Sequence, residues 1–171
     1  TLTPCDSISV YNKDVKTYIV KDADGSLLGV FYSDYMPRAS KRSGAWMSNF
    51  REQQEGVRPL IYNVASFTKP AGDLPSLLTI DEARTMYHEF GHALHGLLTQ
   101  CKYKGVSGTS VAQDFVELPS QIMEHWAVEP EVLKMYAKHY QTREVIPDSL
   151  IAKIENQALF NQGFMTTELL A

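Results

Sequence analysis

The stretch Thr85-Met86-Tyr87-His88-Glu89-Phe90-Gly91-His92-Ala93-Leu94-His95 decides what the rest of the chain is organised around. It contains the pattern His-Glu-x-x-His. On a helix that turns about 100° per residue, His88 and His92 lie about 40° apart and roughly 6 Å along the axis. Both imidazoles can then reach one zinc ion at about 2.0–2.1 Å. Glu89 lies on the flank of the same face, so the pattern predicts a metal centre with a free carboxylate beside it.

Independent signals predict that this stretch is helical. Residues Thr79 to Glu82 have the form of a capping box, a hydroxyl followed three residues later by Glu. Apolar residues recur at three- and four-residue spacing: Ala83, Met86, Tyr87, Phe90, Ala93, Leu94, Leu97 and Leu98. The two histidines are interleaved with this apolar face, so we expect them to point inward. The alternative is a helical core in which both histidines are simply hydrogen-bonded.

The chain has the length and composition of one globular domain. Its 171 residues are 44% hydrophobic and 21% charged, which is ordinary for a protein with a core of its own. The net charge of -4 argues against nucleic acid or an anionic membrane as the main partner. No apolar run approaches the about 18 residues of a transmembrane helix. We therefore expect no nucleic-acid partner and no membrane partner.

Cysteine usage bears on the compartment. Cys5 and Cys101 are too few for a disulfide framework, and neither belongs to a metal-type cysteine pair. Free thiols in a reducing compartment are the simpler interpretation, which favours the cytoplasm. The chain begins at Thr1 without Met, so a removed targeting segment, and with it a periplasmic location, stays open.

Residues 1–67 are expected to be β-rich. The runs 15–20 and 27–32 carry β-branched and aromatic residues, and residues 22–25, Asp-Ala-Asp-Gly, form a turn signal between them. A hairpin is predicted. A calcium loop at the turn is the alternative, but the spaced Asp series and the distal Glu are missing. Residues 59–67 form another β-like run, predicted as an edge strand that pairs with an extended peptide backbone.

Residues 76–171 are expected to be helical. Residues 68–75 precede this part and carry Pro and Gly at short intervals, which is typical of a loop. The whole chain is interpreted as one domain. Beyond the helix that carries the two histidines, three further helical stretches are predicted: 114–126, 130–140 and 147 onward.

Five basic side chains crowd around the sequence Ser43-Gly44-Ala45-Trp46. Two interpretations remain open for them. One is a surface loop of solvated charges. The other is a cleft wall that meets a carboxylate, which Arg can hold through two parallel hydrogen bonds. The five are Arg38, Lys41, Arg42, Arg51 and Arg58.

A catalytic zinc ion usually has three protein ligands and one open position. His95 faces the same way as His88 but lies about 10.5 Å further along the axis, so the two cannot bind one ion. Glu117 lies 25 residues after His92, where a loop and a second helix can return its carboxylate to the first helix. Glu124 is the next choice. The full set of candidates is His95, His125, His139, Glu117 and Glu124.

Several motifs together resemble a known family. They are His88-Glu-Phe-Gly-His92-Ala-Leu-His95, Ser107-Gly108-Thr109, and Asp114-Phe-Val-Glu117 followed by Leu-Pro-Ser-Gln. With these motifs, nearly the whole chain resembles the thimet oligopeptidase family, M3, of zinc peptidases. The stretches 41–46 and 121–126 are most similar to the bacterial peptidyl-dipeptidases of that family.

The resemblance implies a site and a fold. His88, His92 and Glu117 would bind one zinc ion, and Glu89 would be the general base. The implied fold is α+β and mostly α: a zincin-like core with a small antiparallel sheet, the metal helix and further helices. The implied reaction is hydrolysis of short peptides, with release of C-terminal dipeptides.

Three alternatives stay open. One is an endopeptidase, an oligopeptidase of the same family. Another is a zinc-stabilised binding module without turnover. The third is a different zinc-peptidase family with a distinct substrate range. A structural zinc site gains nothing from an unligated carboxylate and usually has four protein ligands. Glu89 therefore favours an enzyme.

Members of the family are several times longer than 171 residues. We therefore expect a catalytic-core fragment that lacks the family's substrate-contacting His and Tyr residues and is weakly active or inactive by itself. Apolar side chains near its end are expected to favour self-association. They are Leu159, Phe160, Phe164, Met165, Leu169 and Leu170.

Overall fold

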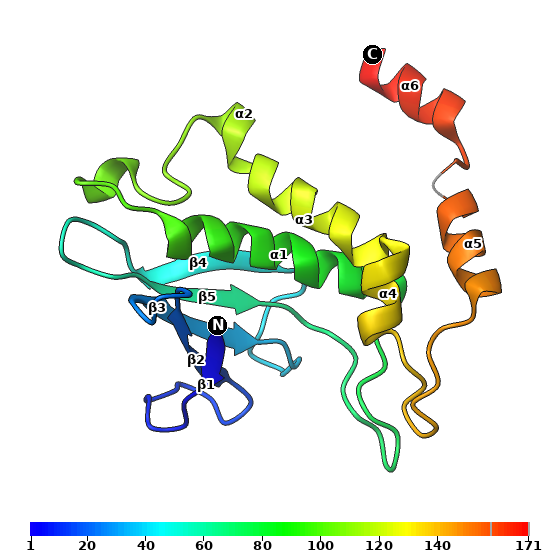
Figure 1. The fold of residues 1–171 in the computed structure, drawn as a ribbon, viewed down its shortest axis with the longest axis horizontal. Coiled ribbons are helices and arrows are strands. Elements are labelled where there is room, and N and C mark those ends of the chain that lie inside the picture. Colours follow the sequence, from blue (N-terminus) through cyan, green and yellow to red (C-terminus); the bar gives the residue numbers. More distant parts are fainter. Residues whose placement is uncertain (158, 171) are drawn as a thin grey trace. The chain divides into compact units, whose positions relative to one another are not determined.

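The computed structural model describes residues 1–157 and 159–170 (Figure 1). Five strands come first and helices follow, which confirms the mixed α+β class. The chain falls into two compact units, Thr1–His125 and Trp126–Ala171. That the chain folds as one domain stays a prediction. None of the described helices is long and apolar enough to cross a membrane.

A five-stranded sheet forms much of the first unit. Its strands are β1 (Leu2–Pro4), β2 (Lys16–Lys21), β3 (Leu27–Asp34), β4 (Trp46–Arg51) and β5 (Leu60–Val64), in the order β1-β2-β3-β5-β4. The predicted hairpin is confirmed, because β2 and β3 pair antiparallel. Gly25 in their connecting turn has a φ of 86°, a conformation that glycine adopts without strain.

The sheet is mixed, so the expectation of an antiparallel sheet is wrong for one pair of strands. β3 and β5 run parallel, whereas the other three pairs are antiparallel. Residues 35–45, between β3 and β4, are too long for a tight hairpin. β3 and β4 therefore do not pair with each other. β5 follows β4 in the chain, runs antiparallel to it and lies between β4 and β3.

One edge of the sheet is β4, and the prediction that residues 59–67 form an edge strand is wrong. β5 lies between β3 and β4, and its Ile61, Asn63 and Val64 are buried. A strand with neighbours on both sides has no free backbone to offer a peptide. Within the described sheet, β4 pairs only with β5, so its other side carries unpaired backbone groups.

Helix α1 (Ile80–Leu98) carries the two histidines and lies along the sheet (Figure 1). The predicted capping box is confirmed. Thr79 Oγ1 accepts from the Glu82 amide at 3.1 Å, and the Glu82 carboxylate accepts from the Thr79 amide at 2.9 Å. The apolar face of α1 packs on the sheet in a core cluster: Val20, Phe31, Ile61, Ala93 and Leu97.

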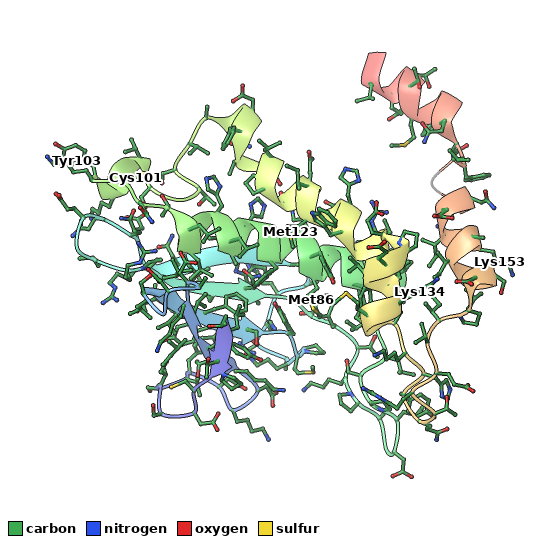
Figure 2. The ribbon with its side chains drawn as sticks, viewed as in Figure 1. Met86, Cys101, Tyr103, Met123, Lys134 and Lys153 are labelled. Atoms are coloured by element: carbon green, nitrogen blue, oxygen red, sulfur yellow. The ribbon has the colours of Figure 1, made fainter. Side chains whose placement is uncertain are left out.

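The helix predicted for residues 114–126 is interrupted. A short 3-10 helix, η1 (Lys104–Val106), is followed by α2 (Gln113–Val116) and α3 (Leu118–Val128). Glu117 lies at the break, because Pro119 can begin a helix but cannot continue one. Met86 of α1 and Met123 of α3 line one apolar cavity of 420 Å³, so the two helices are neighbours within the first unit (Figure 2).

The second unit continues α3 and contains α4 (Pro130–Tyr136), α5 (Asp148–Gln157) and α6 (Gln162–Leu170). The stretch predicted as helical to residue 140 ends at Tyr136. The helical stretch predicted from residue 147 is divided by a turn in which Asn161 has a φ of 64°. Residues 158 and 171, which that prediction included, lie outside the described residues.

Candidate metal centre

Helix α1 brings His88 and His92 onto one face, one turn apart. Their ring centroids are 4.9 Å apart and their planes meet at 83°. Oε2 of Glu117 lies 3.3 Å from Nε2 of His88 and 3.2 Å from Nε2 of His92. One donor atom from each residue lies within 4.8 Å of the other two. The structure thus brings together the three side chains expected as ligands, and metal binding by them stays a prediction.

The chemistry of this donor set fits a zinc ion. Two imidazole nitrogens and a carboxylate oxygen are the ligands of one common class of catalytic zinc site. Nε2 of His92 is the nitrogen that converges with the other donors, whereas its Nδ1 is buried and has no hydrogen-bond partner among the described residues. The converging group has three members within the described part of the chain. One coordination position would therefore stay open, as in catalytic sites.

Ser120 holds the carboxylate of Glu117. Its side chain is completely buried, and Oγ lies 2.7 Å from Oε2 and 2.8 Å from the backbone oxygen of Glu117. The hydrogen bond that Oγ of Ser120 donates to Oε2 is the main cause that lowers the pKa of Glu117, and the two histidines lower it by smaller amounts. Glu117 is thus kept charged and oriented, as a carboxylate ligand requires.

Glu124, the second choice for the third ligand, has a different place. Its Oε1 lies 2.6 Å from Nδ1 of His88, on the side of the ring away from Glu117, and its Oε2 lies 3.4 Å from Arg84. A histidine that binds a metal through Nε2 commonly donates its Nδ1–H to a carboxylate, which fixes the ring orientation. Glu124 therefore fits an outer partner of His88 better than a ligand.

Glu89 is held beside the three donors in a buried environment. It is 7% exposed, and its Oε2 has no hydrogen-bond partner among the described residues. Burial raises the pKa of Glu89 most strongly; Glu117 adds to the increase, and His88 opposes it. A carboxylate with a raised pKa and a free oxygen is suited to accept and return a proton near neutral pH.

The remaining ligand candidates do not join the group. His95 lies further along α1, with its ring 6.0 Å from Phe115 and its Nδ1 buried without a described partner. Burial also lowers the pKa of His95. His139 lies in the second unit, where its Nδ1 accepts from the Thr142 amide at 3.2 Å. His125 is not part of the converging group either.

A cavity of 490 Å³ opens beside the three donors. Besides the histidines and acids it is lined by residues at the start of β4, by Thr109 and by residues of α2, none of which the sequence identified as ligands or catalytic groups. Spacing along the chain gave no signal for their place in this cavity, because that place depends on which strand forms the sheet edge and on how the segment around α2 packs beside α1. The lining residues outside α1 are Ala45, Trp46, Met47, Thr109, Gln113, Val116 and Glu117.

The five basic residues have separate roles. The side chain of Lys41 is 2% exposed and donates to the carboxylate of Asp34, which also accepts two hydrogen bonds from Arg38. Arg58 donates to three backbone oxygens of β3 and of the C-terminal end of α1, and Nε of Arg51 donates to the backbone oxygen of Arg58 at 3.0 Å. For the Arg42 guanidinium, the described residues give no ion pair, and its contact is the ring of Trp46 at 5.6 Å. Neither interpretation of the cluster holds for all five.

Comparison with known proteins supplies the family. The family model described as "Peptidase family M3" matches residues 1–171. The chain is 48% identical over 166 residues to the dipeptidyl carboxypeptidase of Escherichia coli, covering 96% of this chain and 24% of that relative. It is 41% identical to oligopeptidase A of the same organism over 153 residues, 86% of this chain and 22% of the relative.

A plant relative agrees with these two. The probable cytosolic oligopeptidase A of Arabidopsis thaliana is 39% identical over 176 residues, which covers 96% of this chain and 25% of the relative. The chain therefore spans about a quarter of the length of the relatives that it matches. The match to the family description extends over the whole sequence, and by that match the chain belongs to peptidase family M3.

Proposed function

We propose that this chain carries the zinc-binding and proton-transfer part of a peptidase that hydrolyses oligopeptides and releases C-terminal dipeptides. The observation that supports it best is the convergence of His88, His92 and Glu117 beside the buried carboxylate of Glu89, whose Oε2 has no hydrogen-bond partner among the described residues. Similarity to dipeptidyl carboxypeptidase supports the dipeptide-releasing form of the reaction.

Different residues of the chain have different roles in the proposed reaction. His88, His92 and Glu117 would hold the zinc ion, which when bound polarises a carbonyl and lowers the pKa of water. Glu89 accepts a proton from the attacking water at its free oxygen and passes it to the leaving amine. Because Glu89 is buried, its charged form is poorly solvated, and this favours proton uptake at that oxygen.

The peptide would lie along β4. Trp46 and Met47 of this strand line the same cavity as His88 and Glu89. An extended peptide can add to a free sheet edge through backbone hydrogen bonds, which are independent of the peptide's sequence. This arrangement would present the scissile bond to the metal centre and suits an enzyme that accepts many short peptides.

Release of a dipeptide requires a cation that recognises the terminal carboxylate two residues beyond the cut. We assign this role to Arg42. It is exposed, its guanidinium lies over Trp46, and Trp46 also lines the metal cavity. The guanidinium can bind a carboxylate through two parallel hydrogen bonds, and it has no ion pair with any described residue to break first.

The test compares one peptide with a free C-terminus and the same peptide as its amide, with products identified by mass spectrometry. Arg42→Ala should raise KM for the free acid and leave the amide unchanged, whereas Arg51→Ala, at the other end of β4, should change neither. Equal cleavage of both peptides at internal bonds would favour the second candidate, an oligopeptidase, which similarity to oligopeptidase A supports.

A further inference from the structure

We propose that Gly91 is a positioning residue of the metal centre: its missing side chain allows the turn that carries Glu117 to lie directly against α1. The inference rests on the proposed zinc site. It adds a residue that binds neither metal nor peptide and yet sets the distance between α1, which supplies two of the proposed ligands, and the turn that supplies the third.

The contact at Gly91 is between backbones. A Cβ atom there would lie 2.5 Å from the carbonyl oxygen of Pro119 and 2.6 Å from Cα of Ser120. Both are main-chain atoms of the first turn of α3, so neither can rotate away as a side chain does. Carbon atoms in ordinary contact are about 3.5–4.0 Å apart, so any side chain at this position requires a displacement of about 1 Å.

The displaced turn is the one that orients Glu117. Ser120, whose Cα touches Gly91, also holds Oε2 of Glu117 at 2.7 Å. That oxygen in turn lies 3.2 Å from Nε2 of His92, the residue that follows Gly91 in α1. Metal–ligand distances in working sites stay within about 0.2 Å of their usual values, so a displacement of about 1 Å takes the carboxylate out of range.

A purely structural role for Gly91 predicts a different outcome. Ala is a better helix former than Gly, so the substitution favours α1 taken alone and disfavours only its contact with α3. If Gly91 serves packing alone, Gly91→Ala lowers stability and leaves the zinc affinity of the folded protein unchanged. If Gly91 positions Glu117, the zinc affinity falls.

The experiment measures the zinc affinity of the whole chain by competition with a chromophoric chelator, with folding checked by circular dichroism. Gly91→Ala should bind zinc at least about tenfold more weakly, the lower end of the effect of losing an outer partner of a ligand. In the Glu117→Ala background, Gly91→Ala should cause no further loss. Unchanged affinity in folded Gly91→Ala, or the same loss in both backgrounds, would overturn the proposal.

Gly96→Ala is the matched control. Gly96 lies on the same helix, and a Cβ there would meet the side-chain ends of Ile61 and Met47 at 2.8 and 2.9 Å, which can move. Its zinc affinity should stay unchanged. If Gly91→Ala does not fold, Ser120→Ala provides the test. This variant removes the hydrogen bond to Glu117 and should weaken zinc binding. Unchanged zinc affinity in Ser120→Ala would contradict the proposal.

The same measurements distinguish a failure of the Gly91 proposal from a failure of the zinc-site proposal on which it rests. If Glu117→Ala alone leaves zinc affinity unchanged, Glu117 is not a ligand and the metal-site proposal fails. If Glu117→Ala weakens binding while Gly91→Ala and Ser120→Ala do not, only the positioning role fails.

Discussion

In the proposed reaction, the carboxylate of Glu89 accepts a proton from water and passes it to the leaving amine. Glu89→Gln keeps the size of the side chain and removes its basicity, so zinc content should be retained while turnover falls by at least about 10²-fold. Zinc analysis together with a peptide assay on a catalytically active preparation measures both quantities. The exposed Glu52→Gln serves as the control for loss of one carboxylate. Near-normal turnover by Glu89→Gln would exclude it as the base.

We predict that the carboxylate of Glu124 affects zinc binding only through its contact with His88. Glu124→Ala removes the 2.6 Å contact with Nδ1 of His88 and leaves all three proposed ligands in place. Zinc affinity should fall about 10–100-fold, the usual effect of removing such a partner. Chelator competition measures the loss, and the exposed Glu155→Ala is the control. A loss as large as that of His88→Ala would instead indicate that Glu124 is itself a ligand.

Asp34 links pH to stability. Burial is the largest effect on the pKa of Asp34 and raises it, but hydrogen bonds from Arg38, Lys41 and Tyr11 together outweigh burial and lower this pKa. A carboxyl whose pKa is lower in the folded state stabilises the fold above its unfolded pKa of about 3.9. That contribution is lost as pH falls through the folded pKa, so the free energy of unfolding should decrease below about pH 4.

The matching variant is Asp34→Asn. It leaves the ammonium group of Lys41, whose side chain is 2% exposed, without its charged partner. Removing one member of a buried pair typically costs about 3–5 kcal/mol. Urea unfolding at neutral pH measures this cost. Below pH 4, the variant should lose less stability with acid than the unaltered chain, and an equal dependence on pH would contradict the role of Asp34.

At the scale of elements, α1 depends on its capping box. Thr79→Ala removes the acceptor for the Glu82 amide and should lower the free energy of unfolding by about 1 kcal/mol. Thr79→Ser keeps a hydroxyl and should cost less, which makes it the matched control. Urea denaturation followed by circular dichroism measures both, and equal stability of Thr79→Ala and the unaltered chain would show that the cap contributes nothing.

At the scale of the whole molecule, large apolar side chains are exposed on the last part of the second unit. Phe160 is 77% exposed and Leu169 is 87% exposed; Leu159, Phe164 and Met165 are also exposed. The side chain of Leu170, also predicted to belong to this surface, lies outside the described residues. Exposed apolar surface of this kind commonly mediates association.

We therefore predict that the chain self-associates as its concentration rises. Phe160→Ser combined with Phe164→Ser should shift the association to higher concentration, whereas Thr166→Ser, on the same helix as Phe164, should not. Sedimentation velocity over a range of concentrations measures the effect. A chain that stays monomeric at the highest concentration would contradict the prediction.

The sequence by itself determined the metal helix and its candidate residues. The capping box at Thr79, the apolar spacing along α1 and the separation of His88 from His92 are properties of one local segment. Their geometry follows from the regular turn of a helix and needs no knowledge of the rest of the fold. The β2–β3 hairpin was predictable for the same reason, since its turn signal and its strands are adjacent in the chain.

Only the tertiary structure showed that Glu117, and not Glu124, lies beside the Nε2 atoms of His88 and His92. It also showed that β4, and not β5, forms the edge of the sheet. From the residues alone both acids remained candidates, and the resemblance favoured Glu117. Their places depend on the break at Pro119 and on the backbone contact at Gly91. Likewise, the place of β5 between β3 and β4 depends on pairing between strands distant in sequence. Such choices follow from packing between segments, for which local spacing carries no signal.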